Sequence, residues 1–138
     1  MDKIDIRDLR VENWIYHKDC PIPLQVSGVK DNEVYLKHSF EHNRTIGFMR
    51  QDRPSACNIN EIKPIPLENE ILKKNFKRYD MDFEISDNLY ISWNKSKEGY
   101  KLFTLDNLDN NIHLVYLNYV HQLQNLLRDF GIDKEIII

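Results

Sequence analysis

Short runs rich in apolar residues, divided by Asp, Asn and Gly turn signals, predict β-strands through residues 1–65. The runs lie at 14–16, 21–29, 33–37 and 61–65. In the last run, Pro64 and the following Pro66 favour a position at the edge of a sheet, because proline cannot donate a ladder hydrogen bond. This spacing predicts a small antiparallel β-meander or half-barrel.

Residues 38–58 separate these strand runs and show no regular pattern. Gly47, Pro54 and many polar neighbours separate the few apolar side chains of this stretch. We expect a long irregular loop here, with no more than one hairpin strand at 45–50. Loops of this length inside a compact protein tend to be functional or mobile.

Residues 66–138 predict an α-β-β-β-β-α unit. A first helix is expected at 66–79, and its apolar stripe consists of Leu67, Ile71, Leu72 and Phe76. Four strands are expected at 81–85, 89–93, 100–104 and 112–117. Together with the first part, this predicts an α+β protein, built as one compact domain or as two closely packed halves that meet at residue 65.

The last helix is the clearest element. Its apolar residues recur with helical spacing and are Tyr119, Val120, Leu123, Leu126, Leu127 and Phe130. Asn118 is the expected N-cap and Gly131 the expected residue just past the C-terminus. We predict that four of these side chains are buried against the strands. They are Leu123, Leu126, Leu127 and Phe130, with Ile91, Leu102 and Leu114 as their partners.

Composition narrows the function classes. The 138 residues are 41% hydrophobic and 30% charged, which excludes a disordered or collagen-like chain. The net charge is −3, from 10 basic and 10 acidic residues in 1–65 and 9 basic and 12 acidic in 66–138, so a globally basic nucleic-acid binder is disfavoured. No apolar run reaches membrane-spanning length, and Cys20 and Cys57 form no CxxC motif. We expect a cytoplasmic protein with two reduced thiols and no membrane association.

One sequence match suggests a metal. His38, Glu41 and His42 spell H-x-x-E-H, in which two histidines one helical turn apart hold a metal and the glutamate acts as a base. That chemistry needs a helix, and the match lies in the expected loop. A metal-dependent hydrolase is therefore kept only as the second alternative, beside the interpretation as a polar loop.

Other catalytic patterns are weaker still. His17 and Cys20 could pair as imidazole and thiol, but no oxyanion-forming turn surrounds them. Asp80, Asp82 and Glu84 alternate along a strand, as the solvated face of a half-buried strand does. His121 has no carboxylate neighbour in sequence, which favours a structural role. The chain has no phosphate-binding glycine motif. We therefore assign no catalytic residue, no metal and no cofactor.

Two basic sets are candidate binding residues. The first is a dense run at the end of the first predicted helix, and its members are Lys73, Lys74, Lys77, Arg78 and Tyr79. The second lies in the expected loop and consists of Arg44, Arg50 and Arg53. Such residues can contact phosphates, with a tyrosine ring stacking on a base, or acidic surfaces of a protein. The alternative for the first set is that its cations only complement the helix dipole.

Two stretches carry a resemblance to a known family. They are Ile62-Lys63-Pro64-Ile65-Pro66-Leu67, followed by Glu70-Ile71-Leu72, and Tyr119-Val120-His121-Gln122-Leu123-Gln124-Asn125-Leu126. With them the chain resembles small accessory proteins encoded by phages and mobile elements of anaerobic and related bacteria. The resemblance implies no catalytic residue. It implies an accessory role that includes anti-CRISPR-like inhibition of host defence.

Three functions of different classes follow. The first is a non-enzymatic protein that binds a host protein or RNA–protein complex, such as an RNA-guided defence effector. The second is a direct nucleic-acid-binding module that uses the basic run and the loop arginines. The third is the metal-dependent hydrolase built on His38, Glu41 and His42.

Overall fold

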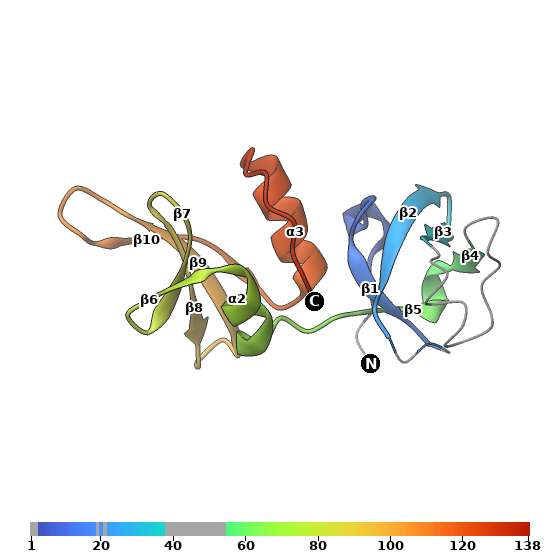
Figure 1. Ribbon diagram of the computed structural model, residues 1–138, viewed down its shortest axis with the longest axis horizontal. Helices are drawn as coiled ribbons and strands as arrows, with labels where there is room; N and C mark the ends of the chain where they lie inside the picture. The colour runs from blue at the N-terminus through green and yellow to red at the C-terminus, as the bar shows by residue number, and fades with distance from the viewer. Residues whose placement is uncertain (1–2, 19, 21, 38–54) are drawn as a thin grey trace. The chain divides into compact units, whose positions relative to one another are not determined.

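The computed structural model describes residues 3–18, 20, 22–37 and 55–138, and it confirms a mixed α+β protein. The chain divides into two compact units, Met1–Ile65 and Pro66–Ile138, each built around its own antiparallel sheet. Figure 1 follows the chain through both units. The loop predicted at 38–58 lies mostly outside the described residues, and its last four residues form a strand instead.

The first unit is a five-stranded sheet in the order β4-β3-β2-β1-β5. Its strands are β1 (Trp14–His17), β2 (Leu24–Lys30), β3 (Glu33–Leu36), β4 (Ser55–Asn58) and β5 (Ile62–Pro64). Two short 3-10 turns, η1 (Ile6–Asp8) and η2 (Ile59–Glu61), complete it. The meander and the edge position of the proline-containing strand β5 agree with the sequence prediction. A bulge between Val26 and Gly28 bends β2 where it pairs with β3.

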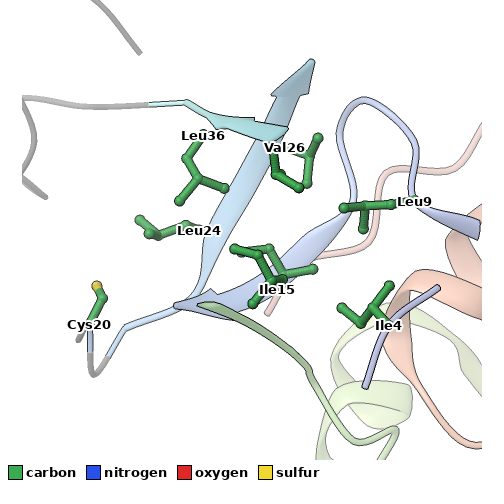
Figure 2. Packing of buried hydrophobic residues seen from close by; sticks show 9 residues of the cluster. Ile4, Leu9, Ile15, Cys20, Leu24, Val26 and Leu36 are labelled. Atoms are coloured by element: carbon green, nitrogen blue, oxygen red, sulfur yellow. The ribbon is translucent and has the colours of Figure 1, made fainter. Parts of the chain in front are cut away.

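Alternate residues of these strands fill the core of the first unit. Ile15, Leu24, Val26, Val34 and Leu36 are fully buried, while their strand neighbours are partly exposed. Figure 2 shows the side chains of β1 and β2 converging in this cluster, which Ile4, Leu9, Cys20 and Ile62 also join. Strands β1, β2 and β3 were predicted from the sequence, and the burial of alternate residues follows from the pleat of each strand.

The second unit has one strand more than the sequence predicted. Its elements run in the order α2 (Asn69–Asn75), β6 (Lys77–Tyr79), β7 (Asp82–Ser86), β8 (Leu89–Asn94), β9 (Gly99–Leu105), β10 (Asn111–Leu117) and α3 (Val120–Asp129). The five strands form one antiparallel meander, β10-β9-β8-β7-β6. The prediction of a helix over 66–79 was wrong at its end, because Lys77–Tyr79 pairs with β7 as strand β6.

A buried asparagine explains where α2 stops. The Nδ2 group of Asn75 donates to the carbonyl of Ile71 at 2.7 Å and to the carbonyl of Ile137 at 2.8 Å. Its Oδ1 accepts the backbone N–H of Ile137 at 2.7 Å. The side chain thus holds the C-terminal segment at the last residue of the helix, and the chain turns into β6 directly afterwards.

Helix α3 confirms part of the predicted core. Leu123 and Leu127 are buried, as are Ile91 and Leu102 on the strands. Leu126 is only half-buried, and Phe130 is 47% exposed because it is the C-cap and follows the last helical turn. The helix begins after Tyr119 rather than after Asn118, and Gln122 Oε1 accepts the N–H groups of both residues.

A bulge overturns the prediction for Leu114. The register of β10 against β9 shifts between His113 and Val115, so Leu114 is the extra residue and is 40% exposed. Met81 is likewise exposed, at 77%, because it lies in the turn before β7 and not in the strand. In both cases a local irregularity breaks the alternation on which the sequence argument relied.

The end of α3 confirms the predicted role of Gly131. Its φ is +72°, its N–H donates to the carbonyl of Arg128, and the N–H of Ile132 donates to the carbonyl of Leu127. This pair of bonds is the Schellman arrangement, which places the residue after the C-cap in the left-handed region.

We expect Gly131→Ala to lower the free energy of unfolding by about 1–2 kcal/mol, because a side chain in the left-handed region costs that much. A β-carbon would have no atom within 4 Å, so the loss reports conformation alone. Urea denaturation measures it. Gly28→Ala is the control, since Gly28 has no positive φ and meets only Tyr35 atoms at 3.9 Å. Equal stability of Gly131→Ala and the parent would contradict the left-handed cap.

Candidate binding surface

Strand register assigns the residues of the second sheet to two faces, because directly paired residues of an antiparallel ladder lie on the same side. Phe83 pairs with Ile91 and Ile91 pairs with Leu102, and all three are buried. Tyr100 lies on this same apolar face and donates its hydroxyl to Asn69 Oδ1 at the start of α2, at 2.7 Å. Helix α2 therefore belongs to the apolar face.

Aromatic rings follow one another across the opposite face of the sheet. The rings of Tyr79 and Tyr90 are 4.9 Å apart between centroids, and those of Tyr90 and Phe103 are stacked at 5.6 Å. On β10, His113 pairs with Phe103 in register and contacts the ring of Tyr116 at 4.4 Å. We call the side of the sheet that carries these five rings the aromatic face.

The outer rings of the aromatic face are exposed to solvent, and its central ring is buried. Tyr79 is 48% exposed and Tyr116 is 38% exposed, whereas Phe103 is buried. The Nζ atom of Lys101 lies 5.6 Å from the centre of the Phe103 ring. A packed central ring between exposed outer rings gives a firm apolar surface with accessible edges, which suits contact with a flat or cationic group.

Acidic residues outnumber basic ones around this face. Asp82 and Glu84 lie on it by register, where Glu84 pairs with Lys77 and Asp82 pairs with Tyr79. Asp80, Asp87 and Asp109 lie in the adjoining turns. The basic residues on the face are Lys77 and Lys101. The face itself therefore carries two acidic and two basic residues beside its tyrosine rings. The surplus of carboxylates comes from the turns, where the basic residues are Lys95 and Lys97.

Asp82 and Tyr90 on this face have raised pKa values, and nearby carboxylates contribute to both shifts. Partial burial raises the pKa of Asp82, the charge of Asp80 raises it further, and Arg78 and Lys101 act in the opposite direction. Burial raises the pKa of Tyr90, and Tyr79, Glu84, Asp109 and Asp87 add to this. Each carboxylate thus makes its neighbours harder to ionise, and a cation placed on this face would relieve that repulsion.

The first predicted basic set does not form one patch. Lys73 and Lys74 are exposed in the last turn of α2. Lys77 and Tyr79 lie on the aromatic face, whereas Arg78 pairs with Phe83 on the other side of β6. The Arg78 guanidinium lies 5.4 Å from the Phe83 ring centre, and its Nε donates to the Asp80 carbonyl. The expectation of a single patch was wrong, because alternation along a strand separates adjacent residues, and binding by these residues stays a prediction.

The second basic set and the metal motif lie outside the described residues. They are Arg44, Arg50 and Arg53, and His38, Glu41 and His42. Among residues 3–18, 20, 22–37 and 55–138, no group of His, Cys, Asp and Glu side chains could hold a metal ion.

The thiols show no catalytic arrangement in the described part of the chain. His17 Nε2 lies 3.2 Å from Glu61 Oε2, and Cys20 Sγ donates to the Ile22 carbonyl at 3.3 Å. The His17–Cys20 pair considered from the sequence is therefore not formed. Cys57 Sγ donates to the carbonyl of Val34, and burial raises its pKa to about 12, so this thiol stays protonated at neutral pH. His121 is buried and stacks on Tyr119, which fits a structural role.

The aromatic face was not predicted from the sequence, because its residues lie far apart in the chain. Tyr90 and Phe103 were treated as ordinary strand residues. A signal existed, since Tyr90 occupies the polar-phase position between the buried Leu89 and Ile91. A tyrosine suits such a position because its ring is apolar and its hydroxyl is polar, which is why tyrosine is enriched at interfaces.

Within the described residues, no helix is long and apolar enough to cross a membrane. Comparison of the chain with protein-family models, with curated proteins and with solved structures found no match. The surface described above therefore provides the argument for function.

Proposed function

We propose that this chain is a non-enzymatic accessory protein of phage or mobile-element type that binds a host nucleoprotein, as an anti-CRISPR-like inhibitor of an RNA-guided defence effector does. The observation that carries the proposal is the aromatic face, with its exposed tyrosines and the surplus of carboxylates in the adjoining turns. The sequence resemblance supplies the biological context. The interface residues in this proposal are Tyr79, Tyr90, Asp82 and Glu84.

The chemistry of the aromatic face fits a basic protein surface. Tyrosine is enriched in protein interfaces because its rigid ring buries a large area at little entropic cost. A guanidinium or ammonium group can lie over such a ring while it pairs with a nearby carboxylate. RNA-guided effectors hold their guide–target duplex in a positively charged channel, so an acidic aromatic surface is complementary to that channel.

Charge favours this partner over nucleic acid alone. Phosphates would meet Asp82 and Glu84 on the face itself, and the flanking aspartates in the turns. Lys77 and Lys101 equal these two carboxylates in number on the face, but in the turns the acidic residues outnumber the basic residues Lys95 and Lys97. Direct nucleic-acid binding is therefore kept as an outcome of the experiment.

The test uses a paired substitution on the aromatic face, Tyr90→Ala with Glu84→Lys. We expect the double variant to fold, because both side chains are only partly buried. It should bind its partner more than about tenfold more weakly, as loss of an interface tyrosine and of a complementary charge commonly does. The matched control is Glu135→Lys, an exposed glutamate near the C-terminus of the same unit.

Two measurements are made on the parent chain and both variants. The first is phage plating on bacteria that carry an RNA-guided defence system and express the chain. The second is affinity purification with and without nuclease, with identification of bound protein and RNA. Protection by the parent and the control but not by the double variant, with nuclease-resistant recovery of effector subunits, supports the proposal. Loss of all captured material on nuclease treatment, with a steep salt dependence, would favour direct nucleic-acid binding instead. Full activity of the double variant would exclude the aromatic face.

A further inference from the structure

The outer edge of strand β10 differs from the other strand edges in the described structure. β10 (Asn111–Leu117) is seven residues long, contains no Asp, Glu, Lys or Arg, and pairs with β9 alone. Figure 1 shows the turn between β9 and β10 extending beyond the neighbouring strands. A long uncharged edge of this kind exposes backbone N–H and C=O groups to pairing with another strand.

The remaining outer strands carry features that discourage pairing. β5 is three residues long and ends in Pro64. β6 is also three residues long and carries Lys77 and Arg78. β4 has only four residues. Short length, proline, lysine and bulges are the usual means by which proteins prevent edge-to-edge contact. β10 has the bulge at Leu114 but is long and contains neither proline nor lysine.

The side chains of β10 are also exposed in an unusual way. Ile112 is 47% exposed, Leu114 is 40% exposed and Tyr116 is 38% exposed. The bulge between His113 and Val115 turns Leu114 away from the regular alternation. The edge therefore offers apolar side chains together with free backbone groups, and a partner strand would cover both.

We propose that β10 is a dimerisation edge that pairs antiparallel with β10 of a second copy of this chain. The pairing places no Asp, Glu, Lys or Arg side chains opposite each other, because the strand contains none. A two-fold axis makes the contact self-complementary and joins two five-stranded sheets into one. Both outer strands of the joined sheet are then β6, whose lysine and short length stop further growth at two copies. This inference does not depend on the proposed function.

The test measures the mass of the full chain by sedimentation equilibrium from micromolar to millimolar concentration. We expect the parent to approach twice the 16.6 kDa of one chain. Leu114→Lys and Ile112→Lys should each weaken dimerisation by more than about tenfold, because each places a charged side chain from both copies in the apolar contact between the two edges. The matched control is Met81→Lys, an exposed apolar residue next to β6, which should dimerise as the parent does.

Hydrogen exchange locates the contact independently of the substitutions. The β10 amides that do not donate to β9 should exchange more slowly as the concentration of the parent rises, and those of Leu114→Lys should not. A parent of single-chain mass at all concentrations would overturn the proposal. So would a dimer that survives both lysine variants, a concentration-independent exchange of β10, or assembly that continues past two copies.

Discussion

Leu123→Ala should lower the free energy of unfolding of the second unit by about 2–5 kcal/mol, the range for truncating a buried leucine to alanine. Leu123 is fully buried on α3, and deletion of its isobutyl group leaves a cavity that close-packed neighbours fill only in part. The matched control is Phe130→Ala. Phe130→Ala removes a larger side chain, but Phe130 is 47% exposed. This substitution should therefore lower the free energy of unfolding much less.

The measurement needs a probe in the second unit alone. The chain has two tryptophans, Trp14 in the first unit and Trp93 in the second. A Trp14→Phe background leaves the fluorescence of Trp93, whose ring contacts Tyr100, as the reporter of the second sheet. Urea titration then gives the loss for each variant. A cost for Leu123→Ala no greater than that for Phe130→Ala would contradict the docking of α3.

Asn75→Asp should also destabilise the second unit strongly at neutral pH. The amide of Asn75 donates to the carbonyls of Ile71 and Ile137, and a carboxylate can donate to neither. The bond to Ile71 is buried and the bond to Ile137 is partly buried, so loss of the first donor alone costs about 1–3 kcal/mol, and the added charge increases the loss. The single retained bond is the N–H of Ile137, which the remaining oxygen still accepts.

The loss of unfolding free energy in Asn75→Asp should be larger at high pH than at low pH. Two carbonyl oxygens face the introduced carboxyl, so its pKa in the folded protein lies above the unfolded value of roughly 3.9. The folded state then favours the protonated form, and the deficit against the parent is largest above the folded-state pKa. It shrinks as the pH falls through that pKa, because a protonated carboxyl can donate one of the lost hydrogen bonds.

Two further variants isolate the role of the amide. Asn69→Asp makes the same chemical change at the start of α2, where the oxygen only accepts from Tyr100, and it should cost little because a negative charge suits a helix N-terminus. Asn75→Leu should be destabilised without the added pH dependence. A pH-independent deficit for Asn75→Asp in urea titrations at pH 4 and pH 7 would contradict the hydrogen-bond assignment.

Both predictions depend on contacts between segments far apart in the chain, and such contacts separate what could be predicted from what could not. The alternation of residues placed Ile91 and Leu102 in the core, because one buried face of a strand leaves a period of two in the sequence. Gly131 marked the end of α3, because few other residues adopt a left-handed cap without strain. Both signals are local.

The candidate binding surface could be predicted only in part. Lys77 and Tyr79 were selected from the sequence and lie on the aromatic face, but the assumed helix also grouped them with Arg78, which lies on the other side of the sheet. Tyr90 and Phe103 join Tyr79 only through strand pairing. A helix and a strand distribute the same adjacent residues over different faces, so the surface could not be assembled before the element was known.

The sequence by itself determined the class of the protein, the phase of strands β7, β8 and β9 and the residues that α3 buries at Leu123 and Leu127. Only the tertiary structure decided that α2 ends at Asn75, because the partner of that side chain is the backbone of Ile137, 62 residues later. It likewise decided that a bulge exposes Leu114 on an uncharged edge, and that the rings of Tyr79, Tyr90 and Phe103 meet on one face. A periodic pattern reports whether a residue is buried, whereas the identity of its partner depends on which distant segments pair.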